Sequence, residues 1–294
     1  MSESHRARRG RTIILTAIAL IAFAANSVLC RLALGHAAID AASFTVIRLL
    51  SGAVVLMGIF VMSGRRGYVD DRGSWLSATM LFSYAITFSF AYVSLTTGTG
   101  ALILFGAVQV TMMLGAIVSG NRPALIEWLG VLTAVGGLIY LVLPGVSAPS
   151  LSGSVLMAIA GMAWAVYSLR GRGIRSPLAY TAFNFLRTIP FVTVVLIAAV
   201  FRAELTINGI VLAIVSGALA SGVGYSIWYA ALTGLSATQA AVVQLLVPVL
   251  AATGGVLFMA EAVSFRLLLA TAIIFSGVSL TFLPVRAGWR VKEN

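Results

Sequence analysis

Long apolar stretches separated by short polar ones dominate the chain. Ten of them approach the roughly 20 residues that a helix needs to cross the ~30 Å hydrocarbon layer of a bilayer. They cover about 12–34, 41–63, 74–96, 98–118, 124–143, 151–169, 177–201, 208–233, 236–258 and 263–284. Runs of this length favour helices over strands, because a helix satisfies its own backbone hydrogen bonds in lipid. The pattern predicts an all-α polytopic membrane protein with ten transmembrane helices.

The second half of the chain repeats features of the first. Arg31 and Arg48 have counterparts in Arg170 and Arg187, with the same spacing in each pair. Because each copy holds an odd number of apolar runs, the two copies would enter the bilayer from opposite sides. Such inverted repeats are typical of secondary transporters. We therefore predict one integrated membrane domain built from two inverted five-helix repeats, covering residues 1–146 and 147–294.

Composition supports the same class. Hydrophobic residues make up 60% of the chain and charged residues 9%, and the mean hydropathy is +1.05. A soluble domain does not expose so little charge. The net charge of +11 could suggest nucleic acid, but the basic residues gather in short loops, so no nucleic-acid partner is expected. Cys30 is the single cysteine, which excludes an internal disulfide and a cysteine-based metal site.

The distribution of basic residues predicts the orientation. Loops on the cytoplasmic side of a bacterial inner membrane are enriched in Lys and Arg. With the N-terminus cytoplasmic, most of the 19 basic residues lie inside. These are Arg6, Arg8, Arg9, Arg11, Arg65, Arg66, Arg72, Arg122, Arg170, Arg172, Arg175, Arg286, Arg290 and Lys292. The sequence thus predicts a multi-pass inner-membrane protein with both termini in the cytoplasm.

Arg48 and Arg187 are the only basic residues that lie well inside predicted spans, away from the span ends. An arginine there is costly unless it finds a partner or reaches the interface. One interpretation is a carboxylate- or phosphate-binding residue. The other is a structural or gating residue that ties helix ends through carbonyls. We expect the second role for both, since similar depth in the two halves suits a scaffold.

Aromatic residues recur towards the middle of several spans. Aromatic rings at span ends usually form interfacial belts, but most of these lie deeper. We expect them to line a central cavity, with lipid-facing or core packing as the alternative. The residues are Tyr84, Phe88, Trp164, Tyr225, Trp228 and Tyr229.

Amides and prolines also mark the spans. Asn26, Asn184, Gln109 and Gln244 carry polar groups that need partners in hydrocarbon. Small residues flank Asn26 and Gln244, which favours a place at the cavity, although hydrogen bonding between helices is an equal alternative. Pro190 and Pro248 each free a backbone carbonyl and permit a bend, so we predict structural or gating roles for them and for Glu261.

Several motifs are absent from the sequence. No predicted span carries an Asp, Glu or His near its middle, there is no His-Glu-x-x-His, and there is no Gly-rich Lys-Ser/Thr phosphate loop. Intramembrane proteolysis, metal-dependent catalysis and nucleotide hydrolysis therefore have no support. We expect a protein that is not an enzyme, holds no metal or other cofactor, and does not couple transport to protons.

The pattern of spans and motifs is similar to a known transporter family. Pro248 is followed by Glu261, by the stretch Leu267-Leu-Leu-Ala, and by Gly277, and each half has an arginine in its second span. These features resemble the EamA family of the drug/metabolite transporter superfamily, and within it the YddG-type exporters of aromatic amino acids. The first half departs from the motif, with Val108 and Asn121 in place of the proline and the glutamate. The resemblance implies ten helices around a central cavity and alternating access.

The sequence therefore favours a monomeric inner-membrane exporter of aromatic or hydrophobic amino acids, surrounded by membrane lipids. Aromatic residues would contact the apolar part of the substrate, and Asn26 and Gln244 its polar end. Two alternatives stay open. One is an exporter of another small metabolite or amphipathic drug, and the other is a lipid-handling or structural membrane protein.

Overall fold

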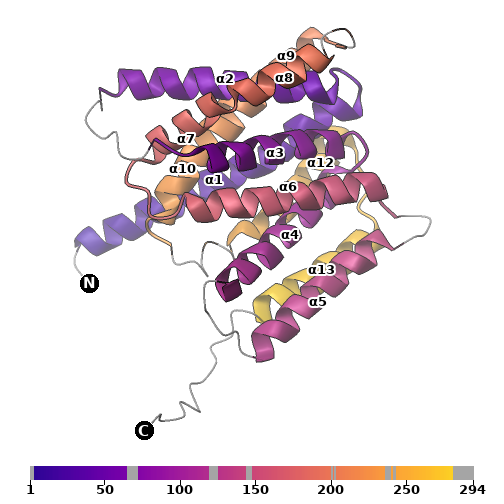
Figure 1. Ribbon diagram of the computed structural model, residues 1–294. Helices are drawn as coiled ribbons and strands as arrows, with labels where there is room; N and C mark the ends of the chain where they lie inside the picture. The colour runs from indigo at the N-terminus through magenta and orange to yellow at the C-terminus, as the bar shows by residue number, and fades with distance from the viewer. Residues whose placement is uncertain are drawn as a thin grey trace.

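The computed structural model describes residues 3–64, 72–118, 125–143, 148–199, 201, 203–235, 240 and 243–280. Within these ranges the fold is all-helical (Figure 1), with one isolated bridge between Ile39 and Leu205. The helices are α1 (Glu3–Gly35), α2 (Ala41–Met62), α3 (Trp75–Tyr92), α4 (Thr97–Val118), α5 (Leu125–Val142), α6 (Leu151–Arg170), α7 (Pro177–Arg187), α8 (Ile189–Ala199), α9 (Ile207–Val215), the π-helix η2 (Ser216–Val223), α10 (Gly224–Leu232), α12 (Leu246–Met259) and α13 (Phe265–Leu280).

Six of the described helical stretches are long and apolar enough to cross a membrane. They are Arg9–Gly35, Ala41–Met62, Thr97–Gly115, Leu151–Arg170, Pro177–Ala199 and Ile207–Leu232, and shorter apolar helices cover Trp128–Val142, Leu246–Met259 and Phe265–Leu280. The structure thus confirms an all-α polytopic membrane protein. The count of ten crossings and the two repeats stay predictions, and the proposed boundary at residues 146 and 147 lies outside the described residues, as does the C-terminal segment 281–294.

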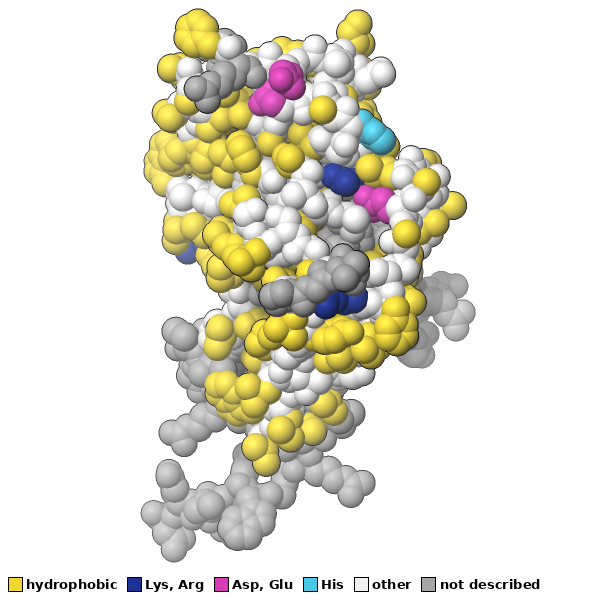
Figure 2. Space-filling model, turned by 90° about the vertical axis from the view of Figure 1, so that its right-hand side faces the viewer, with side chains coloured by type: hydrophobic (Ala, Val, Ile, Leu, Met, Phe, Trp, Pro, Cys, Tyr) yellow, Lys and Arg dark blue, Asp and Glu magenta, His cyan; other side chains and the backbone are white. Residues whose placement is uncertain are grey.

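The surface has the character expected for contact with lipid. Figure 2 shows one face of the molecule, on which the described residues present many hydrophobic side chains and only a few charged ones. Large apolar side chains such as Val54, Leu132, Ile197 and Phe258 are exposed on different helices. Apolar surface this widespread marks contact with a membrane rather than with water.

Helix α1 runs through the middle of the bundle, where it packs against α10, α12 and η2 (Figure 1). Helices α3 and α6 lie side by side, α4 packs on α6, and α5 pairs with α13 along one edge. Helix α2 packs against η2 and α7 on the other side. The segments α2, α3, η2 and α10 therefore lie around α1 near the centre of the molecule, with α6 beside α3.

Side-chain caps fix where several helices begin. Asp40 accepts a hydrogen bond from the Ser43 amide at 2.9 Å and so starts α2, while Ser74, Ser150 and Thr206 cap α3, α6 and α9 in the same way. Such caps satisfy amides that have no partner within the helix. Burial raises the pKa of the Asp40 carboxyl, but hydrogen bonds from the Ser43 and Glu204 amides outweigh it and leave the pKa below its ordinary value.

Both prolines singled out in the sequence lie next to a break in a predicted span. Helix α7 ends at Arg187 and α8 begins at Ile189, directly before Pro190. Residues 243 and 244 are helical, Leu245 is in a turn, and α12 starts at Leu246, so Pro248 lies in its first turn. A proline cannot donate to the carbonyl four residues earlier, which accounts for a break near Leu186 and another near Gln244.

Candidate functional site

A buried polar network centres on Arg48 of α2, which is 1% exposed. Its Nε donates to the Ser221 hydroxyl at 3.0 Å, and its Nη2 donates to the hydroxyls of Tyr84 and Tyr225 at 3.2 and 2.9 Å. The guanidinium also lies over the rings of Tyr84 and Phe88, 5.2 and 4.9 Å from their centroids. All these partners are uncharged, so the network carries the full positive charge of the arginine.

Asn26 of α1 extends the network. Its Nδ2 donates to the Tyr84 hydroxyl at 3.1 Å, and its Oδ1 accepts from Ser216 at 2.6 Å and from Ser221 at 3.4 Å. The Tyr84 and Tyr225 hydroxyls are 3.1 Å apart. The network therefore joins α1, α2, α3, η2 and α10. Asn26 was expected either to line a cavity or to form hydrogen bonds between helices. The structure shows the hydrogen bonds between helices, and it places Asn26 in the central network.

The π-helix η2 brings the two serines of this network into place. Ser216 and Ser221 are its first and sixth residues, and both are fully buried. Gly217 lets η2 approach α2 closely, because a Cβ there would clash with the Arg48 carbonyl oxygen and with Ser51. Short π-helical segments inside longer helices are frequent at functional sites, and this one lies directly against Arg48.

Aromatic rings pack around one side of the network. The Trp164 centroid lies 4.6 Å from that of Tyr225, 5.1 Å from Tyr84 and 5.3 Å from Phe23. Phe23 also contacts Tyr225 and Trp228, at 5.9 and 5.5 Å. We call Phe23, Tyr84, Trp164, Tyr225 and Trp228 the aromatic cluster. Its members are 6% exposed or less, so in this conformation the rings are shielded from solvent by one another and by neighbouring helices.

Two other predicted site residues adjoin the aromatic cluster. Gln244 accepts a hydrogen bond from Trp164 Nε1 at 3.4 Å and donates to the Ala240 carbonyl at 3.1 Å. Tyr229 lies farther along α10, where its hydroxyl donates to the Tyr167 carbonyl at 3.2 Å. Gln244 thus touches the cluster directly, whereas Tyr229 binds the backbone of α6.

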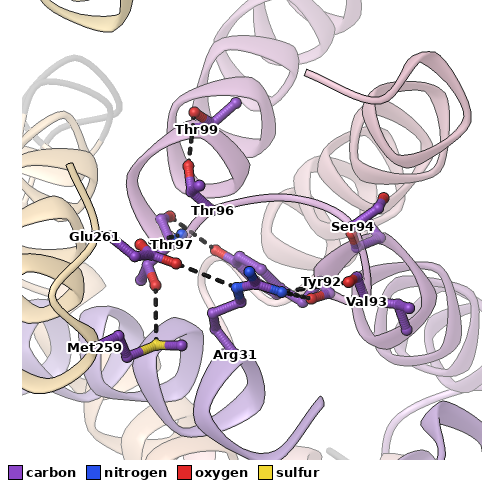
Figure 3. Close-up of polar contacts among 10 residues, drawn as sticks. Arg31, Tyr92, Val93, Ser94, Thr96, Thr97, Thr99, Met259 and Glu261 are labelled. Atoms are coloured by element: carbon purple, nitrogen blue, oxygen red, sulfur yellow. Dashed lines mark hydrogen bonds and ion pairs between the residues drawn. The ribbon is translucent and has the colours of Figure 1, made fainter. Parts of the chain in front are cut away.

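Arg31 and Glu261 form an ion pair at one end of the bundle (Figure 3). Arg31 Nε lies 3.1 Å from Glu261 Oε1, and Arg31 also donates to the carbonyls of Tyr92 and Val93. Glu261 Oε2 accepts from the Thr97 amide at 2.8 Å. We call Arg31, Thr97 and Glu261 the latch. It ties the ends of α1 and α3, the start of α4 and the turn after α12, so Glu261 takes part in a contact across helices and not only in a local cap.

A second set of polar contacts ties the opposite end. Arg170 Nε and the Tyr180 hydroxyl both donate to the Ser77 hydroxyl, at 3.1 and 2.8 Å. Asn184 Oδ1 accepts from the Ser74 amide at 3.1 Å. We call these residues the Ser77 tie. Ser77, Tyr84 and Tyr92 follow one another along α3, so the network around Arg48 lies between the tie and the latch, about 10–12 Å from each at 1.5 Å per residue.

Arg187 differs from its counterpart Arg48. Its Nη1 donates to the backbone carbonyls of Arg72 and Phe183, and its side chain is only partly buried. These contacts hold the end of α7 against the segment before α3. Of the two arginines that lie well inside predicted spans, the structure places Arg48 in the central network and Arg187 near the Ser77 tie.

A cavity of about 550 Å³ lies at the same end as the Ser77 tie, between α1, α2, α7 and α10. Its lining includes Arg11 and Arg175 together with the apolar side chains of Leu15, Leu56 and Ile227. We call it the arginine cavity. Leu56 lies two turns beyond Arg48 on α2, which places the cavity wall about 12 Å along the helix from the central network.

Sequence reasoning missed Phe23, Ser216 and Ser221. A phenylalanine in an apolar run and serines among small residues carry no signal of their own, since both are common where membrane helices pack. The neighbouring glycines Gly217 and Gly222 were the available clue, because they mark a close approach of two helices. Arg31 also received no role, although its position at the end of a span fits the latch that it forms.

These features describe a multi-pass membrane protein whose polar and aromatic centre lies between two sets of polar contacts, the arrangement of a small-molecule transporter. Residues 151–283 match the EamA-like transporter family. The chain is 50% identical to the uncharacterized protein PA1977 of Pseudomonas aeruginosa, over 97% of this chain and 98% of that one. It is 27% identical to an uncharacterized transporter of Archaeoglobus fulgidus, over 92% and 97% of the two chains.

The chain belongs to the EamA family of membrane transporters. A crystal structure with 18% sequence identity superposes with a TM-score of 0.61, over 94% of this chain and 98% of the other. The two proteins therefore share a fold over nearly the whole length of both chains. The family and the transporter relative identify a protein that moves a small molecule across a membrane and not an enzyme.

Proposed function

We propose that this transporter exports aromatic or hydrophobic amino acids across the inner membrane by alternating access, with both termini in the cytoplasm and the monomer as the working unit. The observation that carries the proposal is the juxtaposition of Arg48 and Asn26 with the aromatic cluster. A solute with a polar head and an aromatic body matches both parts at once. Aromatic and apolar side chains with a few placed polar groups are typical of small-molecule sites.

The polar contacts at the two ends support alternating access. The latch joins helices at one end through an ion pair, and the Ser77 tie joins helices at the other end through hydrogen bonds. Opening one set while the other holds would expose the centre to one side of the membrane at a time. The breaks near Pro190 and Pro248 lie where helices could bend during such a motion.

A direct test is efflux from proteoliposomes loaded with a panel of solutes. The panel contains phenylalanine, tryptophan, leucine, glutamate and an amphipathic organic cation. The proposal expects the aromatic amino acids to leave fastest, and expects Trp164→Ala and Gln244→Ala to slow them while the amount of folded protein stays near wild type. Export of the cation alone would favour the second candidate function, a drug exporter, and no flux of any solute would contradict the proposal.

Orientation has its own test. A reporter that is active only in the cytoplasm, fused after residue 294, should give a signal in cells. Signal from a periplasmic reporter at the same place would overturn both the orientation and the expected number of crossings.

A further inference from the structure

No residue in the described part of the chain balances the charge of Arg48. Its hydrogen-bond partners are hydroxyls, and within the described part of the chain no protein atom accepts a hydrogen bond from its buried Nη1. Burying an arginine without an anion is unfavourable, because the guanidinium gives up hydration and gains no countercharge. The centre of the transporter therefore holds one uncompensated positive charge.

None of the three acidic residues whose side chains the structure describes is placed to balance it. Asp40 is occupied at the start of α2 with the Ser43 and Glu204 amides, and Glu261 pairs with Arg31 in the latch. Glu204 is exposed beside Asp40. The remaining acidic residues lie outside the predicted spans or at their ends, and are Glu3, Asp70, Asp71, Glu127 and Glu293. The described residues thus leave the countercharge to a molecule that enters the site.

Two buried donors at the site lack an acceptor within the described part of the chain. Besides Arg48 Nη1, the buried Nε1 of Trp228 has no acceptor among the described residues. Trp228 lies one turn after Tyr225 on α10 and packs against Phe23. Two unused donors, one of them charged, suit a carboxylate, which has two acceptor oxygens and a negative charge.

We propose that the preferred cargo is an aromatic carboxylate with a net charge of −1, held by Arg48 through its carboxylate and by the aromatic cluster through its ring. This inference rests on the proposed function and narrows its cargo. Amino acids share the carboxylate, but their ammonium group finds no carboxylate to bind in this site. Hydroxy-acid and other aromatic monoanions without an ammonium group are therefore carried better than the corresponding zwitterions, and aromatic amines are excluded by the like charge of Arg48.

The arginine cavity is consistent with such a cargo. Arg11 and Arg175 line it together with apolar side chains, so an anion with an apolar body meets the same combination of charge and apolar surface there. Like-signed charges along a route raise the local concentration of an oppositely charged solute. The cavity and the central network thus select for the same chemistry.

The test compares three solutes that share a phenyl ring. Proteoliposomes are loaded with equal concentrations of phenyllactate, phenylalanine or phenethylamine near neutral pH, with the membrane potential clamped, and efflux from protein-free vesicles is subtracted. We expect phenyllactate to leave about tenfold faster than phenylalanine, a difference of ~1.4 kcal/mol, and phenethylamine not to move. Arg48→Gln should abolish the preference, and Arg48→Lys, which keeps the charge, should retain part of it.

The outcomes separate the inference from the proposed function. If phenylalanine moves and phenyllactate does not, or if the preference survives in Arg48→Gln, the inference is overturned while the exporter function stands. If none of the three moves, both fail. Because Arg48→Gln could misfold, the thermal unfolding of purified wild-type protein is also measured with each solute, and only phenyllactate and, more weakly, phenylalanine should raise the unfolding temperature.

Discussion

The Nη2 atom of Arg48 lies 2.9 Å from the hydroxyl of Tyr225, and this hydrogen bond joins α2 to α10 directly after the π-helix η2. The same hydroxyl is 3.1 Å from that of Tyr84. A change in the position of α10 relative to α2 must break these contacts. The pair therefore links the charge of the central network to the helix that carries two members of the aromatic cluster.

Removing the Tyr225 hydroxyl should remove one hydrogen bond from the central network while keeping the aromatic packing. Tyr225→Phe keeps the ring beside Trp164 but leaves Arg48 with one hydrogen bond fewer. Hydrogen bonds to charged groups contribute about 1.5–3 kcal/mol, so we expect a clear loss of transport and a lower unfolding temperature. Tyr140→Phe is the matched control, because Tyr140 lies on α5 near Arg266 and away from the network. Equal effects of the two variants would contradict the role given to Tyr225.

The latch should control access to one end of the bundle. Cys30 is buried and directly precedes Arg31, so labelling of this single cysteine by a membrane-impermeant maleimide reports opening of the latch. Glu261→Gln removes the ion pair and should speed labelling. Glu204→Gln, which neutralises an exposed carboxylate, should leave the rate unchanged. A labelling rate in Glu261→Gln no faster than in wild type would show that the latch does not hold this end closed.

Close packing of η2 on α2 predicts a specific sensitivity to added volume. Gly217→Ala places a methyl group against the Arg48 carbonyl and Ser51, and overpacking of this kind costs about 1–3 kcal/mol. The same change at Gly136 of α5 meets open space and should be neutral or slightly stabilising, since alanine favours helix over glycine. Thermal unfolding of the two purified variants tests the difference, and a Gly217→Ala protein as stable as wild type would mean that η2 does not pack as described.

The hydrophobic pattern was sufficient to predict most of the fold. Predicted runs coincide with α1 to α6 and α13, because lipid forces each long apolar segment to satisfy its backbone within one helix. The sequence also predicted bends at Pro190 and Pro248, and the structure has helix breaks next to both prolines. The π-helix η2 was not predictable, since no residue type within Ser216–Val223 marks a change from i→i+4 to i→i+5 hydrogen bonds.

The candidate site was only partly predictable. Tyr84, Trp164, Tyr225 and Gln244 stood out as aromatic or amide residues deep in apolar runs, and the structure brings them together. Nothing in one sequence distinguishes Arg48 from Arg187, which have equivalent positions in the two halves. Their difference arises from packing, because η2 and α3 meet Arg48 with hydroxyls whereas backbone carbonyls meet Arg187.

Transport is expected to continue without a proton gradient. No predicted span carries an Asp, Glu or His near its middle, so no side chain there can exchange a proton with each transport cycle. Efflux from proteoliposomes down a solute gradient should persist after a protonophore collapses the proton gradient. Loss of efflux that only a restored proton gradient repairs would point to a coupling residue, with Glu261 of the latch as the first to replace.

The most direct test of the central claim, that cargo passes through the network around Arg48, is counterflow in proteoliposomes with Arg48→Gln and Arg187→Gln compared at equal protein density. Both changes remove one positive charge from corresponding positions of the two halves. Uptake of labelled phenyllactate against unlabelled internal solute should fall about tenfold or more in Arg48→Gln, as for loss of a charged contact worth ~1.4 kcal/mol. Uptake of phenylalanine should fall less in the same variant, and both solutes should stay near wild type in Arg187→Gln. Wild-type counterflow in a folded Arg48→Gln protein, or equal losses in both variants, would contradict the account.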